Sequence, residues 1–194
     1  MGKGNYISTI LRSNRTVFSF KDIVLLWGEP GTNTARVRVN YYIKKNELYH
    51  IRKGFYAKDK NYDKYELATK IYTPSYISFE TVLGQSGITF QYYSQIFVTS
   101  YLTREITIDN QIYSFKKIKN LILTNQIGIE AKDNYYIASP ERAFLDVIYL
   151  NKDYHFDNLS ILNWDKVFNI LPIYKNKRMV KKVNEYFKDF KDNQ

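Results

Sequence analysis

Residues 33–45 (NTARVRVNYYIKK) bring together side chains that can hydrogen-bond to DNA base edges and phosphates. In a helix, Arg36 can pair with guanine, Asn40 with adenine, and Tyr41 can pack on a thymine methyl or a sugar. Lys44 and Lys45 follow at the far end, where phosphate contacts are expected. The candidate DNA-binding residues in this segment are Asn33, Thr34, Arg36, Arg38, Asn40, Tyr41, Lys44 and Lys45.

A short β-ribbon is predicted directly after this segment. Side chains alternate from Leu48 to Arg52, Lys53-Gly54 can turn the chain, and residues 55–58 would return as the second strand. Arg52, Lys53 and Lys58 would neutralise phosphates, and each contact should steepen the salt dependence of binding by about one unit. A basic helix followed by a basic ribbon is the layout of a winged helix-turn-helix, whose helix enters the major groove.

Two other interpretations of residues 33–45 are open from the local sequence. The stretch RVRVNYYI alternates with period two and is rich in β-formers, so it could be a strand. In the second interpretation, the segment is a structural helix whose basic face is solvated and does not contact DNA. The upstream residues favour the DNA-binding helix, because they predict two further helices and a turn before it.

These upstream elements begin with residues 4–12, whose apolar side chains share one helical face: Tyr6, Ile7, Ile10 and Leu11. Val17-Phe18 is predicted to be a short apolar link. Ser19 with Asp22 is close to a capping box, and it begins a second helix that ends at Gly28. Residues 29–31 form the predicted turn.

The third helix is expected to begin at a polar cap. Asn33 or Thr34 can supply the side-chain oxygen that accepts a hydrogen bond from a free backbone N–H. The apolar stripe that would face the core is Ala35, Val39, Tyr42 and Ile43.

The charge of the chain is concentrated in its first third. The formal net charge is +10, and residues 1–60 hold 12 Lys/Arg against 4 Asp/Glu, whereas residues 61–194 hold 17 against 15. A compositional bias would spread the excess along the chain. The concentration is typical of a protein that binds nucleic acid at its N-terminal end.

Composition excludes several classes of protein. The 194 residues are enough for one large domain or two small ones, are 44% hydrophobic, so that a core can be buried, and include no cysteine. Disulfides, thiolate metal sites and cysteine nucleophiles are therefore excluded. The sequence has no apolar run typical of a signal peptide or a membrane span, so we expect a cytoplasmic protein without a membrane partner.

The sequence offers no good case for an enzyme. Glu141-Arg142 could act as an acid–base pair, but a Glu in the first turn of a helix is more often a structural complement to the helix dipole. His50 and His155 make no metal-ligand pattern, and no serine lies in a nucleophile elbow. We expect no catalytic residue, no metal and no cofactor. A nuclease-like enzyme that uses Glu141 is the least favoured alternative.

We place a domain boundary in the polar residues 59–63, which gives domains at 1–60 and 61–194. The second domain is predicted to contain a helix at 65–71 and another that Ser78 caps. Its predicted strands are residues 95–99, 104–108 and 112–116, with shorter candidates at 121–123, 127–130 and 135–138. Ser139-Pro140 begins a helix that runs to Leu150. Two amphipathic helices, around Trp164 and around Val183, end the chain, so the predicted fold class is α+β.

A basic cluster precedes and enters the last amphipathic helix. It can be a second nucleic-acid surface, a site for an acidic partner, or a solvated helix face. Its members are Lys175, Lys177, Arg178, Lys181 and Lys182.

Two segments of the second domain resemble blocks of the AbiEi family of bacterial antitoxins. Residues 74–83 (PSYISFETVL), followed by Gly87, resemble the family's "paYIS-x-x-SaL…G" block. Residues 137–146 (IASPERAFLD) look like its "iA-s-p-E-R-A-l-l-D" block, which makes Glu141 and Arg142 candidate interaction residues. The ribbon at residues 48–56 is also similar, and the resemblance spans residues 5–150.

The resemblance implies a two-domain regulator of a toxin–antitoxin system. Its N-terminal winged helix would repress the operon from which antitoxin and toxin are expressed, binding duplex DNA at its own operator, an expected inverted repeat. Its C-terminal domain would counteract a nucleotidyltransferase toxin, often in phage defence by abortive infection. This chain looks shorter than full-length family members, so we expect the toxin-neutralising part to be reduced or absent. The alternative is a protein-interaction module that neutralises a toxin with little specific DNA binding.

Overall fold

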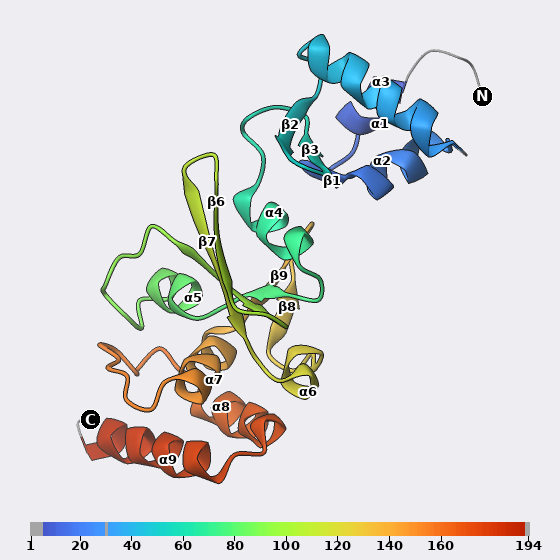
Figure 1. The fold of residues 1–194 in the computed structure, drawn as a ribbon. Helices are drawn as coiled ribbons and strands as arrows, with labels where there is room; N and C mark the ends of the chain where they lie inside the picture. The colour runs from blue at the N-terminus through green and yellow to red at the C-terminus, as the bar shows by residue number, and fades with distance from the viewer. Residues whose placement is uncertain (1–5, 30, 193–194) are drawn as a thin grey trace. The chain divides into compact units, whose positions relative to one another are not determined.

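The computed structural model describes residues 6–29 and 31–192 and is a mixed α+β protein, as expected (Figure 1). Gly4 and Asn5 of the first predicted helix and Pro30 of the predicted turn lie outside the described residues. The chain divides between Lys70 and Ile71 into two compact units, ten residues after the boundary expected from sequence. The later division follows from α4 (Lys64–Ile71), whose Glu66 accepts hydrogen bonds from the backbone N and the hydroxyl of Thr16 at 2.8 and 2.7 Å.

The N-terminal unit begins with helices and closes with a ribbon. Its elements before α4 are α1 (Tyr6–Leu11), β1 (Val17–Ser19), α2 (Phe20–Trp27), α3 (Thr32–Lys44), β2 (Tyr49–Arg52) and β3 (Phe55–Ala57). The strands form an antiparallel sheet in the order β1-β3-β2. The prediction that Val17-Phe18 is only a link was wrong, because Val17 pairs with Ala57 across the sheet. That partner lies far along the chain, where no local signal reveals it.

The start of α2 follows the predicted capping box. Asp22 N donates to the Ser19 hydroxyl at 3.1 Å, and Ser19 N donates to the Asp22 carboxylate at 2.8 Å. Gly28 ends the helix with a φ of 59°, a left-handed conformation that glycine adopts without steric cost. The expected caps of α3 were wrong: Gly31 is the N-cap and makes no side-chain hydrogen bond, and Asn33 and Thr34 lie inside the helix.

The core of the N-terminal unit lies between the three helices and the sheet. Its buried members come from the helices and from the sheet with its connection: Ile10, Phe18, Ile23, Trp27, Ala35, Val39 and Leu48. Tyr42 and Ile43 pack against them, so the predicted apolar stripe of α3 is confirmed and the strand alternative for this segment is excluded. Leu11 was expected in the core but is 52% exposed.

In the described part of the C-terminal unit, six strands form one mixed sheet in the order β6-β7-β5-β4-β9-β8. The β5–β7 and β4–β9 pairs are parallel, and the other neighbours are antiparallel. The strands are β4 (Tyr76–Ile77), β5 (Ile96–Ser100), β6 (Arg104–Ile108), β7 (Gln111–Lys117), β8 (Ile129–Ala131) and β9 (Tyr136–Ala138). The helices are α5 (Glu80–Gln85), α6 (Asn120–Leu123), α7 (Pro140–Leu150), α8 (Trp164–Ile170), the 3-10 helix η1 (Leu171–Tyr174) and α9 (Lys177–Asp192).

Two predictions in this unit were wrong. Residues 121–123, expected as a strand, lie in the short helix α6, since an apolar run of this length cannot distinguish the two structures. Ser78 does not cap α5: the N-cap is Phe79, at a φ of 55°, and the Ser78 hydroxyl donates to Asp146 instead. Ser139 does cap α7, because its hydroxyl accepts a hydrogen bond from Arg142 N at 3.2 Å.

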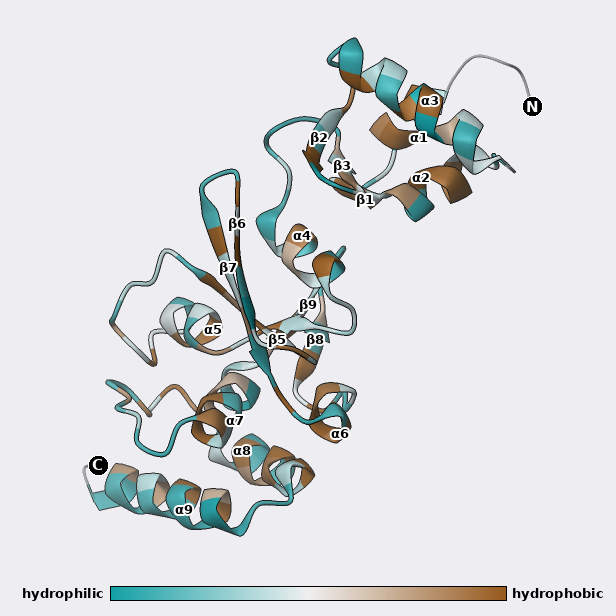
Figure 2. Cartoon of the chain, in the orientation of Figure 1, coloured by the Kyte–Doolittle hydropathy of each residue, from teal (hydrophilic) through white to brown (hydrophobic). Residues whose placement is uncertain are grey.

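Helix α7 is the centre of the helical layer in this unit. It packs on β9 and α5, and α8 and α9 pack on α7. An aromatic cluster joins these helices, with the Phe144 ring centre 5.9 Å from both Trp164 and Tyr186. Figure 2 shows the alternating hydrophilic and hydrophobic bands of α9 that this packing requires. None of the helices formed by residues 6–29 and 31–192 has the length and apolar content to cross a membrane.

Candidate nucleic-acid interface

The solvent face of α3 gathers most of the predicted base-reading side chains. Positions 33, 36, 37, 40, 41 and 44 recur at helical spacing, and all of them are exposed. This face is opposite to the buried Ala35 and Val39. It includes Val37, which is 71% exposed and was not among the predicted residues, and Tyr41, which is 50% exposed. The face therefore combines cations and amides with two apolar groups.

Phe20 holds the N-terminal half of α3 beside the β2–β3 turn. Its ring centre lies 5.6 Å from the guanidinium carbon of Arg36, within the range of a cation–π contact. Its backbone N donates to the carbonyl of Gly54 at 2.9 Å. Phe20 thus contacts both the helix that carries Arg36 and the turn that contains Lys53.

Two further residues near Phe20 and Arg36 were not among the predicted DNA-binding residues. Tyr56 lies near Arg36: burial raises the pKa of the Tyr56 hydroxyl, and the Arg36 charge acts in the opposite direction. His50 is exposed and pairs with Tyr56 across the sheet, with 5.5 Å between ring centres. The strand alternation placed His50 on the ribbon, but only the strand register shows that it adjoins Tyr56.

Arg38 and Lys58 are used inside the unit. The Arg38 guanidinium pairs with Glu29 and lies 3.6 Å from the centre of the Tyr6 ring. The Lys58 ammonium donates to the backbone carbonyl of Ser13. Each of these two predicted DNA-binding cations already has a partner on its own unit, which counts against a contact with DNA.

The remaining predicted cations are at the end of α3 and in the ribbon. Lys44, Lys45 and Lys53 are exposed, whereas Arg52 is half-buried. The Lys45 ammonium lies 4.7 Å from the Tyr41 ring centre, and a hydrogen bond with Tyr41 raises its pKa. These groups extend the positive surface from α3 toward the ribbon.

In the C-terminal unit, the residues that carry the family resemblance meet in a buried network. The carboxylate of Asp146 accepts hydrogen bonds from the hydroxyls of Tyr76, Ser78 and Tyr174 at 2.9, 2.8 and 2.6 Å. Arg142 lies beside Asp146, with 3.4 Å between Nε and Oδ1. Burial raises the pKa of the Asp146 carboxyl, whereas Arg142 and the hydroxyl donors favour its charged form.

Arg142 ties this network to the backbone of neighbouring elements. Its guanidinium donates to the carbonyls of Ile122 and Ile127, both at 2.7 Å, and its side chain is fully buried. Glu141 is 5% exposed and accepts a hydrogen bond from Asn163 N at 3.3 Å. The expectation that Glu141 and Arg142 contact a partner is corrected, because a partner cannot reach a side chain buried in this way.

The predicted basic cluster divides into two groups. Arg178 donates to the carbonyls of Ile148 and Tyr149 at 3.2 Å, where a cation complements the C-terminal end of α7. Lys182 pairs with Asp153 and Glu185 at 3.7 and 3.6 Å. The other members are exposed: Lys175, Lys177 and Lys181.

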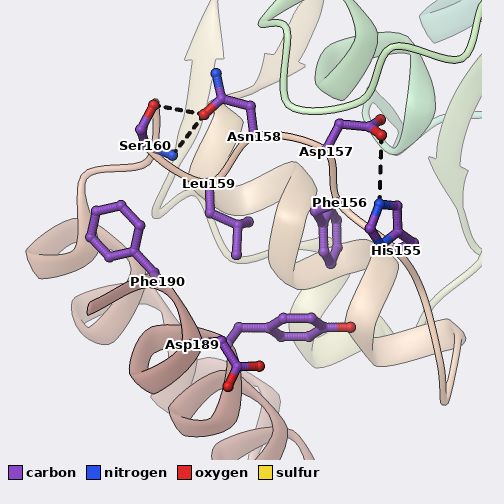
Figure 3. A pocket seen from close by; sticks show the side chains of 9 residues that line it. His155, Phe156, Asp157, Asn158, Leu159, Ser160, Asp189 and Phe190 are labelled. Carbon is purple, nitrogen blue, oxygen red and sulfur yellow. Dashed lines mark hydrogen bonds and ion pairs between the residues drawn. The ribbon is translucent and has the colours of Figure 1, made fainter. Parts of the chain in front are cut away.

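A hollow of about 440 Å³ lies between α9 and the loop before α8 (Figure 3). Phe156, Leu159 and Phe190 line it together with polar side chains. At its edge His155 Nε2 lies 3.6 Å from Asp157 Oδ1, and the imidazole is 88% exposed. In the part of the chain that the structure describes, no three His, Cys, Asp or Glu side chains are grouped so that they could hold a metal ion.

Comparison with known proteins assigns no family. No protein-family model matches the chain, and no curated protein matches it. The likeness to AbiEi antitoxins therefore depends on the sequence blocks alone.

Proposed function

We propose that the N-terminal unit is a winged helix-turn-helix that binds duplex DNA, and that the chain is a transcriptional autorepressor. The observation that carries this proposal is the exposed face of α3, where Asn33, Arg36, Asn40 and Lys44 share one stripe without an acidic residue. Helices α2 and α3 supply the helix-turn-helix, and the β2–β3 ribbon supplies the wing.

In this proposal α3 enters the major groove. Arg36 and Asn40 make the hydrogen bonds that distinguish guanine and adenine, and Val37 packs on a thymine methyl. Lys44 and Lys45 contact phosphates, which position the protein but do not read sequence. Lys53, at the tip of the ribbon, contacts the phosphates beside the groove.

We further propose that the chain acts in the cytoplasm as the antitoxin of an abortive-infection system, with a nucleotidyltransferase toxin as its counterpart. What supports the AbiEi relationship is that Tyr76, Ser78, Arg142 and Asp146, from two separate sequence blocks, meet in one hydrogen-bonded network. Side chains that depend on one another in this way are expected to occur together in a family.

A protein-interaction role for the C-terminal unit is the second candidate. It is favoured by Phe90 and Tyr92, in the loop between α5 and β5, which are 73% and 88% exposed. Exposed aromatic side chains are typical anchors of protein interfaces. In this alternative the toxin is the partner, and specific DNA binding is weak.

The proposed repressor is tested by a mobility shift on the promoter region of its own operon across a salt series. Wild-type protein is expected to prefer this DNA over random sequence. Arg36→Ala/Asn40→Ala should lose the preference, whereas Lys53→Ala should weaken binding to both DNAs equally. Arg12→Ala, at an exposed cation just after α1 and outside the proposed helix-turn-helix, is the matched control and should bind as wild type does. Equal binding of wild type to both DNAs would reject operator recognition.

A further inference from the structure

The excess of positive over negative charge in the C-terminal unit lies in its last helix and the residues just before it. Residues 175–192 hold seven Lys or Arg and three Asp or Glu, whereas residues 71–174 hold eight and ten. The unit would be slightly acidic without this segment. Such a local excess of positive charge is typical of a surface that binds a polyanion.

Part of this charge forms a continuous stripe along α9, which we call the lysine stripe: Lys177, Lys181, Asn184, Lys188 and Lys191. These positions follow one another at spacings of three or four residues, so they share one face of the helix. All five side chains are exposed. At 1.5 Å per residue the stripe is about 21 Å long.

The packing of α9 fixes the direction of the lysine stripe. Met179 and Val183 are fully buried, and Phe187 packs 4.9 Å from the ring centre of Trp164. This apolar face holds α9 on the unit, so the opposite face must point to solvent. The stripe is therefore presented on a rigid helix of 16 residues rather than on a loop.

Two of the other cations of this segment have partners inside the unit. Arg178 is bound to the end of α7, and Lys182 pairs with Asp153 and Glu185. Two acidic residues of α9 border the stripe, because Glu185 follows Lys181 and Asp192 follows Lys188 by four residues, whereas Asp189 lies further from it. The outer face therefore carries four ammonium groups and one amide in the stripe, bordered by two carboxylates, and keeps a positive excess.

We infer that the lysine stripe binds the phosphate backbone of a nucleic acid without reading its sequence. Lysine provides a compact positive charge that suits phosphates, and a duplex presents one charge per about 1.7 Å of its axis, so several phosphates fit along the stripe. This contact lies outside the α3 surface and does not depend on operator recognition.

The composition of the stripe argues against the other polyanionic partners. Protein interfaces are depleted of lysine at their centres and enriched in aromatic side chains, and the stripe has no aromatic residue. A helix that inserts into a membrane surface needs a free apolar face, but the apolar face of α9 is packed inside the unit.

The test replaces Lys177, Lys181 and Lys188 by Gln in the full chain. Binding to a random-sequence duplex is followed by fluorescence anisotropy across a salt series, and circular dichroism checks the fold. The slope of log affinity against log salt is expected to fall by about two to three units, since each phosphate contact contributes about 0.9. The matched control removes the same charge elsewhere in the unit, at the exposed Lys117, Lys119 and Lys152.

An unchanged slope in the stripe variant, or an equal loss in the control variant, would overturn the inference. A second result would also overturn it: wild type binds vesicles of anionic phospholipid, and the stripe variant loses this vesicle binding but keeps wild-type DNA binding. Failure of the α3 proposal appears separately, as equal wild-type binding to promoter and random DNA. The stripe variant is expected to bind promoter DNA and random DNA more weakly by the same factor, so the ratio of the two affinities should stay as in wild type.

Discussion

The guanidinium of Arg36 lies over the ring of Phe20, 5.6 Å from its centre, although the two residues are on different helices. Phe20 is the first residue of α2 and also holds the carbonyl of Gly54 in the ribbon turn. The proposed base-reading cation is thus oriented by the element that positions the ribbon. Helix and ribbon are expected to act as one surface.

Phe20→Leu is expected to reduce the preference for promoter DNA about two- to fivefold, since it removes a cation–π contact of about 0.5–1 kcal/mol and leaves the apolar packing. Phe20→Tyr keeps an aromatic face and should retain the preference. The measurement is the ratio of affinities for promoter and random DNA. A Leu variant with the wild-type ratio would show that the ring does not orient Arg36.

Arg38→Ala is expected to affect stability and Arg36→Ala to affect DNA preference. Arg38 binds Glu29 and the face of Tyr6, so its loss should destabilise the N-terminal unit by about 1–2 kcal/mol and leave the DNA preference unchanged. Arg36→Ala should remove preference with little change in stability. Urea unfolding followed by Trp27 fluorescence in a Trp164→Phe background measures the first effect. Greater loss of DNA preference in Arg38→Ala would contradict the assignment.

The capping box of α2 predicts an acid-sensitive contribution to stability. Burial alone would raise the pKa of Asp22, but hydrogen bonds from Ser19 and the charges of Lys70 and Arg15 lower it below its ordinary value. The folded state therefore favours the carboxylate. Its stabilising effect is complete above the unfolded-state pKa of about 4 and is lost as the pH falls through the lower folded-state pKa.

Asp22→Asn should accordingly destabilise the N-terminal unit at pH 7 and weaken the fall in its stability as the pH drops below about 4. Thermal unfolding followed by circular dichroism at a series of pH values measures both effects. Ser19→Ala, which removes the other half of the box, should cost about 1 kcal/mol at pH 7. Parallel pH profiles for Asp22→Asn and wild type would exclude this role of Asp22.

Features with a local signal were predictable from the sequence. Ser19 with Asp22, and Ser139 with Pro140, predict the start of a helix from a stretch of at most four residues. Both predicted starts were confirmed. The period of Ala35 and Val39 identified the buried face of α3, which also placed the candidate DNA-binding residues on the opposite face.

Features that depend on distant partners were not predictable. Ser78 has the residue type of a helix cap, but Asp146 lies within hydrogen-bond distance and binds its hydroxyl. The roles of Arg38 and Lys58 depend on Glu29 and on the carbonyl of Ser13, which the fold brings to them. A residue's own type and spacing cannot show which of these competing partners it meets.

Arg142→Met is expected to destabilise the C-terminal unit by about 3–5 kcal/mol, because it leaves the buried Asp146 without its cation. The carbonyls of Ile122 and Ile127 would also lose their donor, and these hydrogen bonds join α6 and the segment before β8 to α7. Tyr174→Phe removes one hydroxyl from Asp146 and should cost only about 1 kcal/mol. Urea unfolding followed by Trp164 fluorescence in a Trp27→Phe background measures both. Equal losses for the two variants would mean that Arg142 contributes as a simple hydrogen-bond donor and not as the charge that balances Asp146.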